Sequence, residues 1–352
     1  MTTLISQPVI SLHQLGWKPF LQQQLSLDEW EHCQPARVSA VHRSRIEVIA
    51  EHGSLSLQVV PAMPSLAVGD WVLISPQQQF IRLLDRFSCF WRKAAGSKVE
   101  EQLIASNLDT VFIVCSLNQD FNLSRIERYL ALANQAGVEP VIVLSKADCV
   151  ENPAELQAHV QQIDGMLMVE AINGLDPESV ARLSPWCGQG KTVAFLGSSG
   201  AGKSTLVNTL LASEAQQTGG IREDDSKGRH TTTSRSLHLM PEGALLVDTP
   251  GMRELQLADC EDGITATFSD IKALATQCRF GDCSHQQEPG CAVQQAIESG
   301  DLEERRLRNY HKLNREIAFN SASIAEKRAK SKQIGRYHHA IQKNNRKQKN
   351  RA

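Results

Sequence analysis

The sequence contains no long apolar run and no export-type segment at its start. None of its apolar stretches approaches the roughly 18 to 20 residues that a membrane-spanning helix needs. Residues 1–14 lack the basic segment followed by an apolar core that marks a secretory leader. We therefore expect a cytoplasmic protein that does not enter a membrane.

Aromatic side chains are also scarce, at 5% of the sequence, although apolar residues together make up 41%. In a chain of 352 residues this apolar content is enough to bury a sizeable core, and the length predicts two or three domains. The nine cysteines are scattered, and without an export signal a disulfide framework is not expected. A group of closely spaced cysteines therefore needs another chemical explanation.

Acidic residues are absent from the last part of the chain. The net charge of the whole sequence is only −2, but between Lys327 and Arg351 there are ten Lys and Arg residues and no Asp or Glu. Such a polycation is either a solvated end without a partner or an element that binds a phosphate-rich partner. We favour the second interpretation.

A region of short alternating runs begins at residue 37. Apolar and polar residues alternate in five runs, at 37–41, 46–49, 55–59, 71–74 and 80–84, with turn residues between them. Five short strands predict an OB-type β-barrel at 37–95, a fold often used on nucleic acid, although the barrel could also serve as a structural cap. Residues 1–36 form an N-terminal extension, with a short helix expected around 28–32.

From residue 96 the pattern changes to alternating strands and helices. Buried-strand runs occur at 109–117 and 140–144 with helical spacing at 123–136 between them, and a strand at 193–196 precedes a helix at 204–211. Such alternation predicts a parallel sheet with helices on both faces. We assign this central α/β domain to residues 96–257.

A glycine-rich loop connects the strand at 193–196 to the helix that follows it. The loop matches the GxxxxGK[ST] pattern of phosphate-binding loops, and its residues are Gly197, Ser198, Ser199, Gly200, Ala201, Gly202, Lys203, Ser204 and Thr205. In such a loop backbone N–H groups and the helix dipole bind phosphates, Lys203 reaches the β- and γ-phosphates, and Ser204 ligates Mg²⁺. An accidental glycine-rich turn is the alternative, which the flanking strand and helix disfavour.

Two further motifs complete a guanine nucleotide site. Ser145-Lys146-Ala147-Asp148 follows the strand at 140–144, and the Asp148 carboxylate can accept hydrogen bonds from guanine N1 and N2, a donor pair that adenine lacks. In Asp248-Thr249-Pro250-Gly251, Asp248 would hold Mg²⁺ through water and Gly251 would donate to the γ-phosphate. Each motif taken alone could be a polar turn. The guanine motif precedes the phosphate-binding loop, the reverse of the usual order, and this predicts a circularly permuted GTPase.

The remaining nucleotide-binding elements match their patterns less closely. Ala171 can meet guanine O6 through its backbone, but Glu170 stands where a serine is expected. The segment Gly228-Arg229-His230-Thr231-Thr232-Thr233 supplies a threonine for Mg²⁺, with Thr232 favoured and Thr231 the alternative. Met252 replaces the glutamine that orients water in many GTPases, so intrinsic hydrolysis should be slow, and we hypothesise that His230 positions the water.

Closer to the C-terminus, four soft metal ligands lie within a short stretch. They are Cys278, Cys283, His285 and Cys291, and three thiolates with one imidazole suit a tetrahedral, structural Zn²⁺ site. Buried core cysteines or a redox pair are the alternative. A basic helix is expected from about 302 to 319, and its structural interpretation is a solvated face with Leu302, Leu307, Tyr310 and Leu313 packed inward. The zinc-binding, α-rich module is placed at 258–320 and the basic tail at 321–352.

Together these motifs resemble the bacterial ribosome small-subunit-dependent GTPase A family, RsgA. The resemblance rests on Ser145 to Asp148 ahead of Gly197 to Thr205, then Gly228 to Thr233, Asp248 to Gly251, and the Cys-x4-Cys-x-His-x5-Cys spacing, and it spans nearly the whole chain. It implies an assembly factor that binds the small (30S) ribosomal subunit late in maturation, contacts rRNA through the barrel and the zinc module, and hydrolyses GTP when that subunit stimulates it. We expect the protein to be a monomer. Glu170 and the length of the tail depart from the family pattern.

Two rival functions remain open at this point. A metabolic enzyme with a phosphate-binding loop would transfer phosphate to a small molecule, but Asp148, Met252 and the basic tail disfavour it. A nucleotide-independent RNA-binding protein with a vestigial GTPase would bind RNA without turning over GTP.

Overall fold

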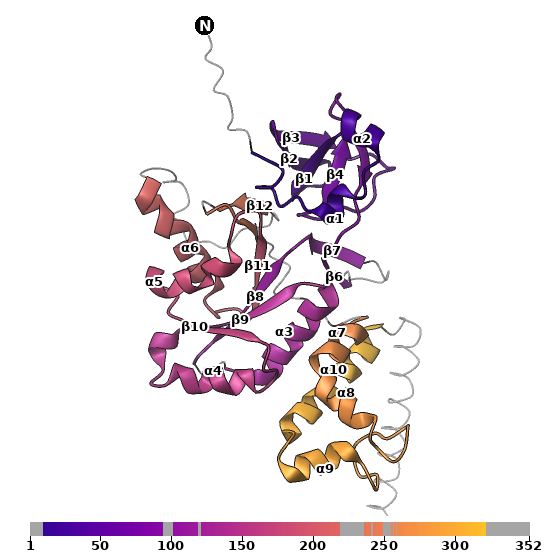
Figure 1. The fold of residues 1–352 in the computed structure, drawn as a ribbon, viewed down its shortest axis with the longest axis vertical. Helices are drawn as coiled ribbons and strands as arrows, with labels where there is room; N and C mark the ends of the chain where they lie inside the picture. The colour runs from indigo at the N-terminus through magenta and orange to yellow at the C-terminus, as the bar shows by residue number, and fades with distance from the viewer. Residues whose placement is uncertain are drawn as a thin grey trace, which may run out of the picture.

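The computed structural model describes residues 10–93, 101–118, 121–218, 236–240, 242–248, 255, 257 and 259–321. It has an N-terminal region rich in β-strands, a central α/β region and a helical C-terminal region, which follow one another down the long axis in Figure 1. None of the helices in the described part of the chain is long and apolar enough to cross a membrane.

The N-terminal region contains the five strands that alternation predicts. Its elements are α1 (Pro19–Gln22), α2 (Leu27–His32), β1 (Gln34–Val41), β2 (Arg45–Ala50), β3 (Gly53–Gln58), β4 (Trp71–Ile74) and β5 (Phe80–Leu83). β1 is antiparallel to both β2 and β4, and a bulge between Val38 and Ala40 interrupts its pairing with β2. Because every second residue of these strands faces one side, Val38, Val48 and Val72 pack in one apolar cluster, whereas Trp71 and Leu73 of β4 pack in a second one with Leu15 and Leu21. Closure of these strands into an OB-type barrel stays a prediction.

A buried arginine connects this region to the chain that follows. Arg37 is 1% exposed, and its guanidinium donates to the backbone carbonyls of Leu15 at 2.5 Å, Gly69 at 3.4 Å and Asn107 at 3.0 Å. Burial lowers the pKa of Arg37 to about 10, which leaves it charged at neutral pH. One side chain thus joins three segments that are far apart in the sequence.

The central region is a mixed sheet with helices on both faces. Its strands are β8 (Thr110–Ser116), β9 (Glu139–Ser145), β10 (Met168–Ile172), β11 (Thr192–Gly197), β12 (Ser236–Leu239) and β13 (Leu245–Asp248). Between and around them lie α3 (Leu123–Ala136), η1 (Ala147–Cys149), α4 (Pro153–Gln161), α5 (Pro177–Val180), η2 (Ala181–Trp186) and α6 (Lys203–Thr218), and a separate hairpin pairs β6 (Cys89–Lys93) with β7 (Glu101–Ser106). Alternate residues of β8 enter different cores: Ile113 packs in one cluster and Phe112 in the other.

The strand order places elements distant in sequence side by side. The order is β10-β9-β8-β11-β13-β12, in which the first five strands are parallel and β12 is antiparallel. β11 therefore lies between β8, which precedes it in the chain, and β13, which follows it. Beyond β12 the sheet continues into the N-terminal region, because Ser236 pairs with Ala40 of β1.

The C-terminal region consists of α7 (Glu261–Thr267), α8 (Ser269–Ala275), α9 (Ala292–Ser299) and α10 (Glu304–Ser321). Leu302, Leu307 and Leu313 are buried as predicted and share one apolar cluster with α3 of the sheet layer. The basic face of α10 is only partly solvated, since Arg306 is 5% exposed and ion-paired with Glu127 of α3. The C-terminal region is thus joined to the sheet layer by apolar packing and by charge, and Figure 1 shows α7 beside α3.

Candidate nucleotide and metal sites

The glycine-rich loop lies at the carboxyl end of β11, where ligands bind in open α/β sheets. Gly197, Gly200 and Gly202 have φ values of 153°, 78° and 92°, a region that other residues rarely adopt. A Cβ on Gly197 would lie 2.3 Å from the carbonyl oxygen of Val114 on β8. Glycine is therefore required both for the path of the loop and for its close approach to the neighbouring strand.

Lys203 begins helix α6 and folds back over the loop. Its side chain is largely buried, and its Nζ donates to the carbonyl of Gly197 at 2.7 Å and to that of Ser198. Ser204 follows in the first turn of α6 and is exposed. An ammonium group and a helix N-terminus thus meet at one loop, an arrangement that can bind phosphate.

The predicted guanine motif contacts this loop directly. The Ser145 hydroxyl, at the end of β9, donates to the Ala201 carbonyl at 2.5 Å, and the Lys146 Nζ donates to the Gly200 carbonyl at 3.0 Å. Ser145 and Ala201 are 56 residues apart in the sequence. Asp148 lies in the following turn, η1, with an exposed carboxylate that accepts a hydrogen bond from the Cys149 thiol at 3.6 Å.

Ala171 lies on β10, next to the strand of the guanine motif. Its neighbour Ile172 pairs with Ser145, and the Ala171 carbonyl accepts a hydrogen bond from Arg182 at 3.1 Å. Glu170 forms an ion pair with the same arginine at 2.5 Å. Sequence analysis did not identify Arg182, because no motif predicts a partner that tertiary packing supplies.

Asp248 ends β13 and has an exposed side chain. β13 is parallel to β11, with Val247 opposite Ala194, so Asp248 lies at the same sheet edge as the glycine-rich loop. The other predicted residues of the nucleotide site lie outside the described residues: His230, Thr231, Thr232 and Gly251.

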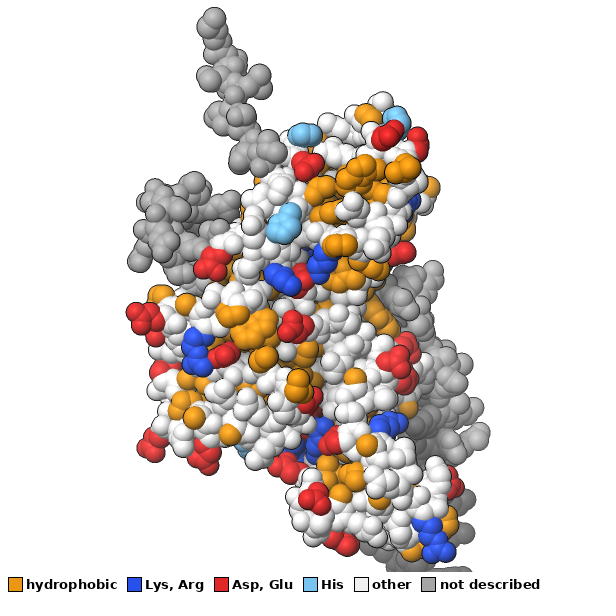
Figure 2. All heavy atoms as spheres, viewed as in Figure 1, with side chains coloured by type: hydrophobic (Ala, Val, Ile, Leu, Met, Phe, Trp, Pro, Cys, Tyr) orange, Lys and Arg blue, Asp and Glu red, His pale blue; other side chains and the backbone are white. Residues whose placement is uncertain are grey.

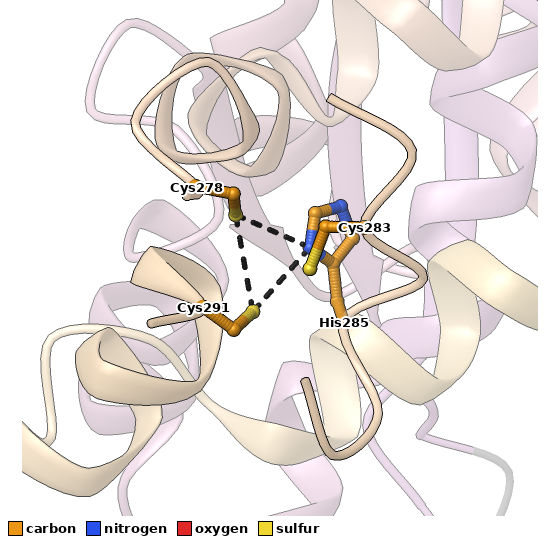
Figure 3. Close-up of side chains that lie close together, drawn as sticks. All are labelled: Cys278, Cys283, His285 and Cys291. Carbon is orange, nitrogen blue, oxygen red and sulfur yellow. Dashed lines mark hydrogen bonds between the residues drawn. The ribbon is translucent and has the colours of Figure 1, made fainter. Parts of the chain in front are cut away.

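The four soft ligands converge in the C-terminal region, as Figure 3 shows. The Cys278 sulfur lies 3.9 Å from that of Cys291, and His285 Nδ1 lies 3.6 Å and 3.5 Å from these two sulfurs. With the fourth ligand, Cys283, all the ligand atoms lie within 4.8 Å of one another. Tetrahedral Zn²⁺ with usual bond lengths requires about 3.8 Å between two sulfurs and about 3.5 Å between sulfur and nitrogen. The donor set and its spacing therefore fit a tetrahedral metal ion.

Neighbouring groups support these ligands. Cys291 caps the N-terminus of α9, where its sulfur accepts from the Gln294 backbone, and the Gln294 side chain donates to the His285 carbonyl at 2.6 Å. Burial lowers the pKa of His285, which favours the neutral imidazole that binds metals. Glu288 accepts hydrogen bonds from the Ser284 hydroxyl and from nearby backbone N–H groups, and these lower its pKa to about 2. The loop between the ligands is thus ordered by its own hydrogen bonds.

Comparison with known proteins agrees with this arrangement. The family profile described as RsgA GTPase matches residues 83–258, and an ABC transporter profile matches residues 180–348, a range that includes the glycine-rich loop. A protein of Vibrio parahaemolyticus named small ribosomal subunit biogenesis GTPase RsgA 2 is 63% identical and covers 92% of this chain and 91% of its own length. A protein of Mesorhizobium japonicum named small ribosomal subunit biogenesis GTPase RsgA is 45% identical over 93% of this chain and 95% of its own.

Solved structures support the same fold. The chain superposes on YjeQ from Thermotoga maritima with a TM-score of 0.61 and 23% identity, covering 80% of this chain and 97% of that one. It superposes equally well on YloQ, described as a circularly permuted GTPase, with a TM-score of 0.61 and 23% identity over 82% and 96% of the two chains. Given this fold, the family profile and the high identity to the named relatives, the chain belongs to the RsgA family of circularly permuted GTPases.

Proposed function

We propose that this chain hydrolyses GTP to GDP and phosphate while acting in late maturation of the small (30S) ribosomal subunit, and that this subunit stimulates hydrolysis. The names of the relatives support a role in small-subunit biogenesis. One structural observation carries the GTPase part of the proposal: Ser145 and Lys146 contact Ala201 and Gly200 across a long sequence separation, which puts a base-reading motif beside a phosphate-binding loop.

In this proposal the two ends of GTP are bound by different parts of the sheet edge. The phosphates are bound by backbone N–H groups of the loop from Gly197 to Thr205 and by Lys203. The base is bound by Asp148, which accepts from guanine N1 and N2, and by the Ala171 backbone. The Lys203 ammonium group donates to carbonyls of its own loop. It could therefore exchange these acceptors for a phosphate oxygen without a large movement of the side chain.

Mg²⁺ is assigned to Ser204, Thr232 and Asp248, with Gly251 on the γ-phosphate. The exposed Asp248 at the end of β13 and the exposed Ser204 at the start of α6 support this assignment for the two described side chains. The metal ion would neutralise charge between the β- and γ-phosphates. We propose His230 as the group that orients the attacking water, because Met252 has no polar atom that could do so.

The Cys278, Cys283, His285 and Cys291 cluster is proposed to hold one structural Zn²⁺. With all four positions filled by protein, such an ion leaves no position open for a substrate, so it would stabilise the C-terminal region and take no part in hydrolysis. The spacing of the three measured ligand pairs supports this.

We further propose that the chain has an OB-type barrel at 37–95, the GTPase domain at 96–257 and the zinc module at 258–320. We also propose that the protein is monomeric and cytoplasmic and that it contacts rRNA. On the face shown in Figure 2, acidic and basic side chains are interspersed, without a continuous basic patch. The barrel and the zinc module are the proposed contacts to rRNA. The tail at 321–352, which holds the long basic run of the sequence, is proposed to bind a phosphate-rich partner.

GTP turnover with and without purified small ribosomal subunits tests the proposal. We expect stimulation by the subunit, and no stimulation by free rRNA. Lys203→Ala should abolish turnover. Asp148→Asn should change specificity from GTP to xanthosine triphosphate, because the introduced amide N–H can donate to the 2-oxo group of xanthine, whereas the 2-amino group of guanine needs an acceptor. Equal turnover of GTP and ATP, or no response to the subunit, would contradict the proposed function.

A further inference from the structure

A short loop lies between the two halves of the candidate nucleotide site. It runs from the end of β10 through Ala171 to Gly174, and its start is fixed by the pairing of Ile172 with Ser145 of the guanine motif. Its other end lies beside α6, the helix that leaves the phosphate-binding loop, since a Cβ added to Gly174 would come into van der Waals contact with Thr205 and Leu206. The loop thus touches both the base-reading and the phosphate-binding segments.

The start of the loop is held by an arginine from outside both segments. β10 is the edge strand of the sheet, and its carbonyls at Val169 and Ala171 point outward and accept side-chain donors. Gln157 donates to Val169 at 2.6 Å, and Arg182 donates to Ala171 at 3.1 Å. Arg182 is oriented in turn by Glu170 at 2.5 Å. A planar guanidinium can donate to the carbonyl and face the carboxylate at once, which an ammonium group cannot do with the same geometry.

The end of the loop is held by α6 itself. The Thr209 hydroxyl, which lies two turns into this helix, donates to the Gly174 carbonyl at 2.7 Å. The bond is between residues 35 positions apart in the sequence. It therefore ties the position of the loop to the helix whose first residues are Lys203 and Ser204.

We propose that Arg182 and Thr209 are positioning residues that clamp the loop from Ala171 to Gly174 in the conformation that receives guanine. This inference rests on the proposed GTP-binding function and deepens it. A flexible loop would have to be ordered each time a nucleotide binds, and that entropy cost lowers affinity. In this chain the Glu170–Arg182 pair restrains the loop at the position where the family pattern has a serine.

The test is a set of matched substitutions in the full-length protein, with GDP affinity measured by fluorescence titration and steady-state GTP turnover measured alongside. Arg182→Met and Thr209→Val each remove a single hydrogen bond to the loop. Each should raise the dissociation constant for GDP and the KM for GTP by roughly five- to tenfold, the equivalent of one hydrogen bond. The turnover rate at saturating GTP should not change, because the phosphate-binding residues are untouched.

Controls separate positioning from general stability. Thr209→Ser keeps the hydroxyl and should bind GDP with wild-type affinity. Arg182→Lys should bind GDP with an affinity between those of the wild type and Arg182→Met. Gln157→Leu removes the donor to Val169 on the same edge strand, away from the loop, and should leave affinity unchanged. If Arg182→Met and Thr209→Val both bind GDP as tightly as the wild-type protein does, this inference is wrong and the proposed function is unaffected. Wild-type protein that binds no guanine nucleotide would overturn the proposed function as well.

Discussion

Glu127→Gln should separate the contribution of charge from that of shape at the contact between α3 and α10. The Glu127 carboxylate is fully buried and accepts hydrogen bonds from Arg305 at 3.0 and 3.1 Å, from Arg306 at 2.9 Å and from Asn309 at 2.5 Å. Glutamine keeps the volume but removes the charge and offers one acceptor oxygen in place of two. The substitution therefore removes one of the two carboxylates that the buried Arg306 guanidinium contacts, and leaves it with Asp270 alone.

The expected loss of unfolding free energy depends on which acidic partners Arg305 and Arg306 keep after the substitution. Removing one partner of a buried ion pair typically costs about 3 to 5 kcal/mol. Burial acts to lower the pKa of Arg306, but the hydrogen bonds and charges of Asp270 and Glu127 outweigh it and raise that pKa. Since Arg306 would keep Asp270 at 2.7 Å and Arg305 is partly exposed, we place the loss at the lower end, about 3 kcal/mol.

Urea unfolding followed by circular dichroism at 222 nm measures this loss, because the C-terminal region is helical. Glu304→Gln on the same helix is the control, since its ion pair with Arg308 is exposed and should contribute less than about 1 kcal/mol. The double variant Glu127→Gln, Arg306→Met should lose less than the sum of its two single variants, because it removes the more deeply buried of the two guanidinium groups that the Glu127 carboxylate pairs with. A cost below about 1 kcal/mol for Glu127→Gln would refute the reasoning that paired charge holds these helices together.

Three further predictions concern other parts of the molecule. Cys278→Ser, or treatment with a strong zinc chelator, should unfold the loop between the ligands and lower the melting temperature, and a chelator that removes no metal and changes no melting temperature would contradict the metal assignment. The hydrogen bond from Arg82, together with those from Ser26, lowers the pKa of Glu29 from 4.5 to about 2. The ionised carboxylate therefore stabilises the folded state above pH 4.5, and this stabilisation is lost as the pH falls toward 2. Glu29→Gln should flatten this part of the curve of unfolding free energy against pH. Gly197→Ala should abolish GDP binding or folding, because the new Cβ would lie 2.3 Å from the Val114 carbonyl; retention of wild-type affinity would show that the strand can move.

Local patterns in the sequence predicted the secondary structure well. The helix expected at 123–136 is α3 (Leu123–Ala136), and each of the five runs expected as N-terminal strands overlaps one of β1 to β5. These predictions succeed because the period of apolar residues and the turn residues report the local backbone conformation. The metal ligands were identifiable for a similar reason, since all four lie within one short stretch of chain.

The inverted order of the nucleotide motifs could also be read directly, because each motif is a local pattern that carries its own chemistry. The sequence by itself thus determined the family and the circularly permuted α/β GTPase fold, whereas the OB-type barrel and the ligands for phosphate, guanine and metal stay predictions. Segments outside the described residues, among them Gly228 to Thr233, remain predictions from sequence alone.

Only the tertiary structure decided which side chains meet. The Ser145 hydroxyl, expected near the base, donates to Ala201 of the phosphate-binding loop. Arg306, expected on a solvated face, is buried against Glu127 at a separation of 179 residues. Arg182 and Thr209 belong to no motif. Such contacts depend on how packed elements bring distant residues together, and neither periodicity nor local propensity contains that information, because both are properties of neighbouring residues along the chain.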